Sequence, residues 1–332
     1  MKIEGWSIVL RCDASPEIGF GHLTRSLALA RELVDRGGKV TFAIVRGPQA
    51  VALVEREGYA VRNRIDAGPQ PHALVLEVRD ETPRSDIDVL RARGVLIATI
   101  DDPTSRRLSA DLAFYPPIPQ IEAFGWEGFA GTRLVGGEWV VLRRTFAEPP
   151  VRDMRPRPTV LVTMGGSDPA GMTVTAIEAL ATMSEAFDVT VVLGPGFRDR
   201  KRLTDRLRTL SHSVVVYEQP SDMRAVMLGA DLAVASFGVT AYELAATATP
   251  AVYLCLTDDH ARSAASLAQA GAAVVLGVYT GSEGPGIAAA VRTLVMDNDR
   301  RDVMGRAGRL LIDGRGAARV ADRIIKELET RR

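Results

Sequence analysis

Residues 13–25 of the chain read DASPEIGFGHLTR. They follow a strand-like apolar run, Trp6 to Leu10, and open an amphipathic, helix-like run from about His22 to Asp35. The Gly19-Phe20-Gly21-His22 turn therefore places an imidazole at a helix N-terminus, above the carboxyl end of a strand. Open α/β sheets bind ligands at that edge, and the helix dipole and backbone N–H groups favour anions there. The spacing alone leaves two interpretations open: a histidine that faces a ligand, or a glycine-rich turn whose histidine caps the helix.

The rest of the chain repeats this strand-to-helix pattern. In the first half, strand-like runs cover residues 7–11, 40–45, 73–76 and 95–100, and helical patterns cover 22–35, 49–57 and 86–93. In the second half, strand-like runs cover 159–164, 189–193, 214–217, 232–235 and 251–255, and helical patterns fill the gaps. The alternation predicts parallel sheets with helices on both faces.

A proline-rich, charged stretch from Glu148 to Pro158 separates the two halves. Prolines at this density block both a helix and a central strand, so the stretch is typical of a linker. A length of 332 residues also exceeds the usual size of one hydrophobic core. The sequence therefore predicts an α/β chain of two doubly wound, Rossmann-like domains, at residues 1–148 and 159–316. A last amphipathic helix is expected at about 317–330, and a ligand is expected between the two sets of strand ends.

The composition is that of an ordinary globular protein, with 46% hydrophobic and 25% charged residues. A formal net charge of zero argues against a nucleic-acid partner. Cys12 and Cys255 lie in or beside apolar runs and are expected to be buried thiols of a cytoplasmic protein. The histidines are scattered without metal-ligand spacing, so no metal is expected. A polar N-terminus and the lack of a bilayer-long apolar stretch predict a soluble protein without a signal peptide or stable membrane insertion.

Two loops in the second half carry small residues between a strand and a helix. In Gly165-Gly166-Ser167-Asp168-Pro169 the glycines allow close backbone approach, and Ser167 or Asp168 can cap the next turn. In Ser236-Phe237-Gly238-Val239-Thr240 the last three amides converge on one spot that suits a diphosphate. Glu243, one turn into that helix, can accept hydrogen bonds from a ribose. For the first loop, a plain turn at the entry of the domain remains the alternative.

Acidic residues follow two further strand-like runs. Asp101-Asp102 comes after the 95–100 run and can bind a polar ligand or cap a turn. Asp259 and His260 stand at the start of a helical pattern at 261–270, where they can contact a sugar or act as ordinary caps.

Two enzyme classes lack support in the sequence. No Gly-x-Ser-x-Gly elbow is present for a serine nucleophile. Gly19-Phe20-Gly21 lacks the third glycine of the dinucleotide-binding fingerprint, which argues against a dehydrogenase.

The motifs together resemble one family. Asp13-Ala14-Ser15 with Gly19-x-Gly21-His22-x-x-Arg25, then Gly165-Gly166-Ser167-Asp168-Pro169, then Ser236-x-Gly238-x-Thr240-x-x-Glu243 occur in this order. They look like the UDP-2,4-diacetamido-2,4,6-trideoxy-β-L-altropyranose hydrolases of pseudaminic acid synthesis, a family that merges with spore-coat polysaccharide proteins often called predicted glycosyltransferases. The resemblance covers nearly the whole chain, including Asp101-Asp102 and the Leu142-Arg143-x-x-Phe146 segment. It implies the GT-B fold: two Rossmann-like domains facing a central cleft that holds a nucleotide-sugar, with the last helix crossing back onto the first domain.

The resemblance also implies roles for single residues. His22 matches the family's catalytic base, which deprotonates a water that attacks the anomeric carbon while UDP leaves with inversion; an imidazole titrates near neutral pH and suits this task. The second domain is implied to bind UDP, with Gly238, Val239 and Thr240 at the diphosphate, Glu243 at the ribose and Met223 presenting backbone to the base. The other residues expected to bind substrate are Asp13, Gly19, Gly21, Arg25, Gly165, Gly166, Ser167, Ser236, Asp259 and His260. No metal or cofactor is implied, because a helix N-terminus can stabilise the departing diphosphate.

The chain departs from the family pattern at two positions that face the sugar or the attacking water. The family commonly shows Asn-Gln where this chain has Asp259-His260, and Asp-His-Tyr where this chain has Glu77-Val78-Arg79. The UDP loops are kept, so the sequence predicts nucleotide-sugar binding more firmly than it predicts the sugar or hydrolysis.

The sequence thus predicts a cytoplasmic, monomeric enzyme that hydrolyses a UDP-linked amino-deoxy sugar of the pseudaminic-acid type. One alternative is an inverting glycosyltransferase in which His22 activates an acceptor hydroxyl instead of water. Another is a non-catalytic nucleotide-sugar binding protein, which the altered Glu77-Val78-Arg79 keeps open. The glycan served, whether of flagellin, capsule or another polysaccharide, is left open.

Overall fold

The computed structural model describes residues 5–15, 19–77, 82–152 and 155–331 of the chain. The chain divides into two compact units. Unit 1 comprises Met1–Pro117, Ile121–Arg144 and Gly314–Arg332, and unit 2 comprises Ile118–Gln120 and Thr145–Asp313. Among the described helices, none is both long and apolar enough to cross a membrane.

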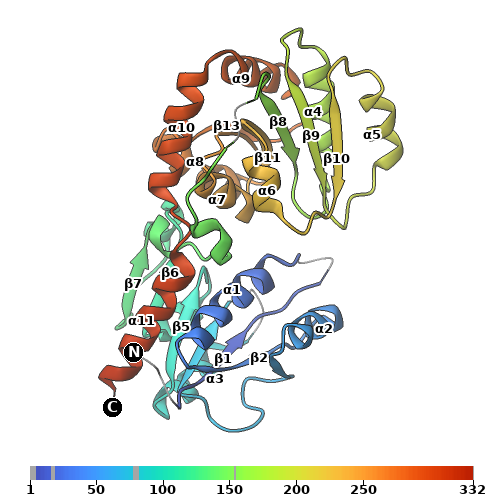
Figure 1. The fold of residues 1–332 in the computed structure, drawn as a ribbon. Coiled ribbons are helices and arrows are strands. Elements are labelled where there is room, and N and C mark those ends of the chain that lie inside the picture. The colour runs from blue at the N-terminus through green and yellow to red at the C-terminus, as the bar shows by residue number, and fades with distance from the viewer. Residues whose placement is uncertain (1–4, 16–18, 78–81, 153–154, 332) are drawn as a thin grey trace. The chain divides into compact units, whose positions relative to one another are not determined.

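Unit 1 is built on a parallel sheet whose described strands run in the order β3-β2-β1-β4-β5-β6-β7 (Figure 1). The strands are β1 Ser7–Arg11, β2 Lys39–Ala43, β3 Ala60–Arg62, β4 Ala73–Leu76, β5 Leu96–Ile100, β6 Leu112–Tyr115 and β7 Thr132–Val135. The helices are α1 Gly21–Asp35, α2 Pro48–Arg56, α3 Arg84–Ala92 and α11 Gly316–Thr330, with the 3-10 helices η1 Ser105–Ser109 and η3 Gly137–Trp139. Two more 3-10 helices, η2 Pro119–Ala123 and η4 Arg144–Ala147, include positions where the unit assignment changes.

The strand order of this sheet reverses between β1 and β4. From β1 the chain passes through α1 to β2 on one side, whereas β4 pairs with β1 on the other side, with Arg11 opposite Leu76. A reversal of this kind opens a crevice at the carboxyl edge of the sheet, where α/β proteins bind ligands. Residues that directly follow β1 and β4 therefore meet at this crevice.

Unit 2 repeats the plan with the described strand order β10-β9-β8-β11-β12-β13. The strands are β8 Thr159–Thr163, β9 Asp188–Leu193, β10 Val214–Glu218, β11 Leu232–Ser236, β12 Ala251–Cys255 and β13 Ala273–Val278. The helices are α4 Met172–Ala181, α5 Arg200–Leu207, α6 Met223–Leu228, α7 Val239–Ala246, α8 Asp258–Gln269, α9 Gly284–Met296 and α10 Asn298–Leu311. Here the order reverses between β8 and β11, so the loops after these two strands share one edge.

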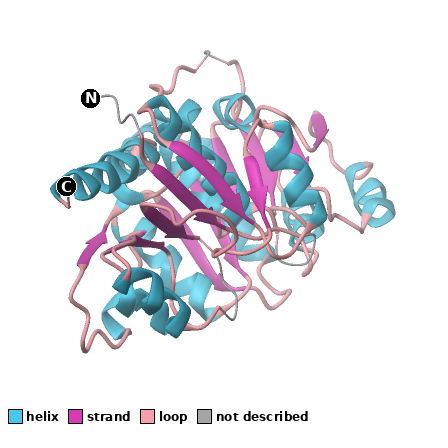
Figure 2. Cartoon of the chain, turned by 90° about the horizontal axis from the view of Figure 1, so that it is seen from below, coloured by secondary structure: helices cyan, strands magenta, loops and turns pink. Residues whose placement is uncertain are grey.

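Apolar runs explain why these strands are central. Every residue of β4, β5, β8, β11 and β12 is buried, as expected for parallel strands covered by helices on both faces. In Figure 2 the strands lie between helices. Each unit has its own hydrophobic core.

The last helix, α11, belongs to unit 1 although all of unit 2 precedes it in the chain. Its apolar stripe, which includes Val320, Ala321, Ile324 and Leu328, lies in the core that contains Leu29 and Leu33 of α1. Helices α1 and α11 therefore pack together (Figure 1). Fully burying a side chain of this size stabilises a fold by about 1.5–3 kcal/mol.

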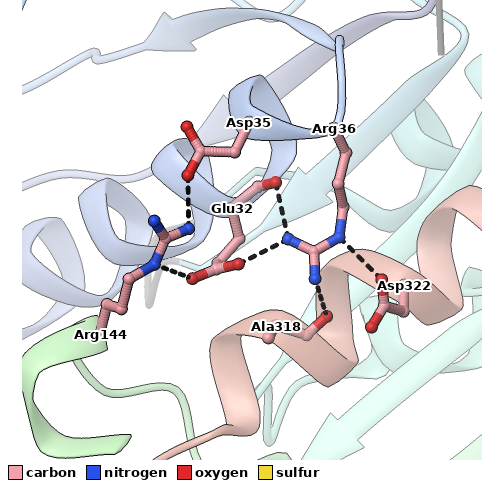
Figure 3. A network of polar contacts seen from close by, with 6 residues as sticks. All are labelled: Glu32, Asp35, Arg36, Arg144, Ala318 and Asp322. Atoms are coloured by element: carbon pink, nitrogen blue, oxygen red, sulfur yellow. Dashed lines mark hydrogen bonds and ion pairs between the residues drawn. The ribbon is translucent and has the colours of Figure 1, made fainter. Parts of the chain in front are cut away.

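Ion pairs reinforce the contact between α1 and α11 (Figure 3). The Glu32 carboxylate accepts hydrogen bonds from Arg36 Nη1 at 2.5 Å and from Arg144 Nε at 2.8 Å. Arg36 Nε in turn donates to Asp322 of α11 at 2.7 Å. Burial opposes the charge on Glu32, but the hydrogen bonds from Arg144 and Arg36 outweigh it and hold the pKa of Glu32 below its ordinary 4.5.

The proline-rich stretch after Glu148 does not separate the two units. The boundary falls between Arg144 and Thr145, and the described part of the stretch belongs to unit 2. Arg152 ties the stretch to unit 2: its guanidinium donates to the carbonyl of Leu228, the last residue of α6, at 3.2 Å and to that of Thr247, just after α7, at 2.9 Å. Prolines keep the backbone extended, and one arginine fixes it to two helix ends.

Candidate functional site

His22 is the second residue of α1, and its side chain contacts Glu77. The N-cap residue of α1 is Phe20, and it forms no side-chain cap hydrogen bond. His22 Nδ1 lies 2.9 Å from Glu77 Oε1, and the imidazole is 21% exposed. The imidazole is thus directed to the residue that follows β4, at the crevice of the unit 1 sheet.

A charged cluster surrounds this pair. Arg25 Nη2, one turn along α1, lies 2.5 Å from Glu77 Oε1 and 3.2 Å from His22 Nδ1. Arg25 Nη1 lies 3.7 Å from Asp101 Oδ2, and Asp101 follows β5 with a left-handed φ of 53°. A left-handed φ is strained for a residue other than glycine and is enriched at functional sites. Helix α1 thus contributes His22 and Arg25 to the cluster, and the residues directly after β4 and β5 contribute Glu77 and Asp101.

Asp13, which the sequence predicts to bind substrate, uses both carboxylate oxygens for hydrogen bonds within the protein. Its two carboxylate oxygens accept hydrogen bonds from Arg11 Nη1 and Nη2 at 2.6 and 2.7 Å. Oδ1 also accepts from the backbone amides of Val45 at 2.9 Å and Arg46 at 3.0 Å, in the loop after β2. Asp13 is 3% exposed, so its side chain holds two loops of the edge together.

The glycines before α1 shape the turn. Gly19 has a left-handed φ of 80°, and its amide donates to the carbonyl of Ser15 at 2.8 Å. Gly21 is the first residue of α1. Residues 16–18 lie outside the described residues. So do Val78 and Arg79, which are two of the three residues of the altered Glu77-Val78-Arg79 position.

Asp102, the second acid after β5, caps a turn. Its carboxylate accepts from the Thr104 amide at 2.8 Å and from Arg106 Nε at 2.9 Å. Asp102 is 1% exposed. Of the two roles that its position allows, the structure supports the cap.

In unit 2, the loops after β8 and β11 meet where the strand order reverses. Gly165 has a left-handed φ of 74°, and a Cβ placed on it would lie 3.6 Å from Ser236 Oγ. Gly166 and Ser167 are exposed. Asp168 caps α4, as predicted, because its oxygens accept from the amides of Met172 at 2.9 Å and Thr173 at 2.8 Å.

The N-terminus of α7 is open. Its N-cap residue Gly238 has extended backbone and no side chain to cap the helix, and a Cβ added there would meet nothing within 4 Å. Gly238, Val239 and Thr240 are half-buried, whereas Glu243 is 9% exposed. The first amides of a helix without a cap are free to bind an anion.

Two further predicted residues, Asp259 and His260, lie in the first turn of α8. The helix begins at Asp258, three residues earlier than expected, because Thr257 Oγ1 caps it by accepting from the His260 amide at 3.1 Å. The Asp259 carbonyl and Oδ1 accept from Gln120 Nε2 at 2.8 and 3.0 Å. The His260 ring lies 6.1 Å from the Phe237 ring, which joins this turn to the loop after β11.

Met223 and the two cysteines complete the list of predicted residues. Met223 is the first residue of α6, directly after its cap Asp222. Cys12 and Cys255 are buried free thiols, as predicted, and burial raises the pKa of Cys12 to about 12 and that of Cys255 to about 11. Neither thiol is therefore activated as a nucleophile. Within the described ranges, no group of three or more His, Cys, Asp or Glu could hold a metal ion.

Sequence reasoning missed the role of Glu77, which it treated only as a departure from a family pattern. The available signal was an acid directly after the buried run 73–76, in a chain whose first helix begins with a histidine. The contact between Glu77 and His22 forms because β4 lies next to β1, and the apolar pattern of the sequence does not show which strands are neighbours.

Comparison with solved structures shows which fold these two units form. MurG from Acinetobacter baumannii superimposes with a TM-score of 0.73 over 96% of this chain and 99% of that chain, at 16% identity. The calicheamicin glycosyltransferase matches with a TM-score of 0.65 over 98% and 99% of the two chains, at 19% identity. The fold is GT-B.

Curated relatives agree with that fold. A UDP-N-acetylglucosamine–N-acetylmuramyl-(pentapeptide) pyrophosphoryl-undecaprenol N-acetylglucosamine transferase of Anaeromyxobacter sp. (strain Fw109-5) is 34% identical over 58% of this chain and 52% of its own length. The spore coat polysaccharide biosynthesis protein SpsG of Bacillus subtilis is 25% identical over 48% of each chain. The chain spans about half the length of the curated relatives it matches. No family model matches it.

Proposed function

We propose that this protein is a nucleotide-sugar enzyme that hydrolyses a UDP-linked amino-deoxy sugar. Unit 2 binds UDP, and His22 of unit 1 is the general base. In the reaction, water gives a proton to the imidazole as its oxygen bonds to the anomeric carbon. The bond from that carbon to the diphosphate oxygen breaks, and UDP leaves with the electron pair. Attack opposite the leaving group inverts the anomeric centre.

The observation that carries the proposal is the meeting of the loops after β8 and β11. Gly165 approaches Ser236 at the strand reversal, and α7 begins beside them without a side-chain cap. Backbone amides and the helix dipole at such an end favour the charge of a diphosphate, including the charge that develops as it leaves. The similarity to SpsG and to an N-acetylglucosamine transferase supports a nucleotide-sugar ligand.

Glycine 238 provides a direct test of the UDP site. A methyl group at Gly238 meets nothing within 4 Å in the protein. In the proposed site it would compete for space with a diphosphate bound at the α7 amides. We expect Gly238→Ala to fold normally and to bind UDP about tenfold more weakly or worse, a loss of ~1.4 kcal/mol or more. Gly284→Ala is the matched control, because Gly284 also starts a helix of unit 2 and also has open space around it.

Calorimetric titration with UDP measures both variants. Equal weakening in both, or none in Gly238→Ala, would contradict the assignment of α7 as the diphosphate site. Failure of the wild-type protein to bind UDP at all would overturn the proposal.

A panel of UDP-sugars separates the reactions. We expect UDP release without an acceptor, an inverted product, and a loss of about 10²–10⁴-fold in His22→Ala, the range usual for a general base. Release that needs an added acceptor would instead establish the transferase, which the 34% identity to a transferase favours as second candidate. Binding without turnover on any substrate would leave a nucleotide-sugar binding protein.

A further inference from the structure

We propose that Glu77 is the positioning residue of the base: it holds His22 in the tautomer with a proton on Nδ1, so that Nε2 is the nitrogen that accepts a proton. This inference rests on the proposed role of His22. Arg25 shares the same carboxylate oxygen and offsets its charge.

Two contacts of Nδ1 favour opposite tautomers, and the shorter one carries the inference. A carboxylate can only accept hydrogen bonds, and His22 Nδ1 lies 2.9 Å from Glu77 Oε1, where a lone pair on Nδ1 would face another electron-rich atom. Arg25 Nη2 can only donate and lies 3.2 Å from Nδ1, a contact that suits a lone pair there. Because the contact with the carboxylate is the shorter of the two, and Arg25 Nη2 has Glu77 Oε1 as an acceptor at 2.5 Å, we assign the proton to Nδ1.

The backbone fixes Glu77 in place. Its amide donates to the carbonyl of Arg11 at 2.9 Å, which continues the pairing of β4 with β1 by one residue. Strand β1 in turn leads into the turn before α1, where His22 lies. The distance between carboxylate and imidazole is thus set by two neighbouring strands of one sheet.

Glu77 is a buried carboxylate directed at the start of α1. The side chain is 1% exposed, and its Oε1 lies 2.9 Å from His22 Nδ1 and 2.5 Å from Arg25 Nη2. A buried charge is stable only where it is paired and hydrogen-bonded. Both contacts lead to α1, so the side chain connects the end of β4 to the helix that carries His22.

The neighbouring charged and titratable groups come from α1 and from the ends of β1 and β5. Arg25 contacts Glu77, and Asp101 after β5 contacts Arg25 at 3.7 Å. Cys12 after β1 is close enough to feel the charge of Glu77, but burial raises its pKa to about 12, so it stays a neutral thiol near neutral pH. When His22 accepts a proton, Glu77 is the anion in direct contact with the new imidazolium.

The matched test compares Glu77→Gln with Asp102→Asn. Each substitution removes the charge of an acid that is 1% exposed, follows one of two neighbouring strands and is paired with an arginine. Of the two acids, only Glu77 contacts His22. In Glu77→Gln we expect unchanged UDP affinity and a fall in kcat on the order of 10²–10⁴-fold, because the imidazole is no longer held in one tautomer. Asp102→Asn is expected to lower stability and to leave kcat unchanged.

A second measurement uses the wild-type protein and does not depend on a variant that folds. Long-range ¹⁵N–¹H correlation spectra distinguish the two neutral tautomers of histidine, and the His22 signal is the one absent in His22→Ala. We expect the tautomer with the proton on Nδ1. A proton on Nε2 overturns the inference, as does a Glu77→Gln enzyme with wild-type kcat. If no UDP-sugar is turned over, the proposed function is overturned. The NMR spectrum of the wild-type protein would still establish the His22 tautomer.

Discussion

Asp13 and Arg11 form an ion pair in which both partners are almost fully buried, at 3% and 1% exposure. Removing one member of such a pair leaves a charge in the interior without compensation. We expect Asp13→Asn to destabilise the protein by about 3–5 kcal/mol, which is typical of breaking a buried pair. Chemical denaturation followed by tryptophan fluorescence measures the change.

Arg64 and Asp66 offer a matched control on the surface. They have the same two-residue separation and also form a bidentate pair, through Nε and Nη2 at 2.8 and 2.7 Å, but are 70% and 54% exposed. Asp66→Asn is expected to leave the denaturation midpoint unchanged, because solvent screens exposed pairs. If Asp13→Asn behaves like Asp66→Asn, Asp13 has no structural role and its predicted contact with substrate regains priority.

Asp13 and Glu77 show where prediction from sequence stops at this scale. In the sequence, each is an acid just after a buried strand, and each can bind a ligand or hold a loop. The partner in space distinguishes them: Asp13 meets Arg11 two residues away, whereas Glu77 meets His22 fifty-five residues away. The second contact depends on which strands are neighbours, and the linear pattern of apolar residues does not carry that information.

Helices α1 and α11 are joined through Glu32, and this contact depends on pH. The pKa of Glu32 lies below its ordinary 4.5 in the folded protein, because hydrogen bonds from Arg144 and Arg36 outweigh burial. A lowered pKa adds stability above pH 4.5, and this stability is lost as the pH falls through the folded-state value.

We therefore expect the free energy of unfolding to fall more steeply below pH 4.5 in the wild-type protein than in Glu32→Gln. Urea denaturation at a series of pH values from 7 to 3 provides the measurement. Near neutral pH the variant is expected to be the less stable of the two. Parallel curves for the two proteins would show that the network around Glu32 adds no stability that depends on its charge.

The elements found in the sequence are the ones with long or fully buried patterns. The predicted runs 7–11, 73–76 and 251–255 match β1, β4 and β12 residue for residue. Strands β3, β7 and β13 were missed, and all three lie at the edges of their sheets. An edge strand has one neighbour and less apolar burial, so its sequence pattern is weak: β7 has polar, exposed Thr132 and Arg133. The four-residue β6, which is also fully buried, was missed as well.

The two units offer two tightly packed helical glycines, one in each. A Cβ on Gly316, at the start of α11, would overlap the carbonyl of Val140, and a Cβ on Gly305 of α10 would overlap the carbonyl of Ala248. We expect each alanine substitution to cost about 1–3 kcal/mol, the usual cost of overpacking. Gly316→Ala should weaken unit 1, and Gly305→Ala should weaken unit 2.

Tryptophan fluorescence separates these effects, because Trp6, Trp126 and Trp139 all belong to unit 1. Gly316→Ala is expected to lower the denaturation midpoint seen by fluorescence, whereas Gly305→Ala should lower only a transition followed by circular dichroism. An identical drop in both signals for both variants would mean that the units unfold as one cooperative body.

The membership of α11 in unit 1 sets the order in which the molecule is completed during synthesis. Most of unit 1 leaves the ribosome first, but the apolar face of α1 stays uncovered until Val320, Ile324 and Leu328 have been made. At usual rates of translation, the segment from Thr145 to Asp313 occupies the ribosome for on the order of ten seconds. During that interval the nascent unit 1 exposes the apolar face of α1 to solvent, while all residues of the unit 2 core are being synthesised. The half that is synthesised first is therefore the half that finishes folding last.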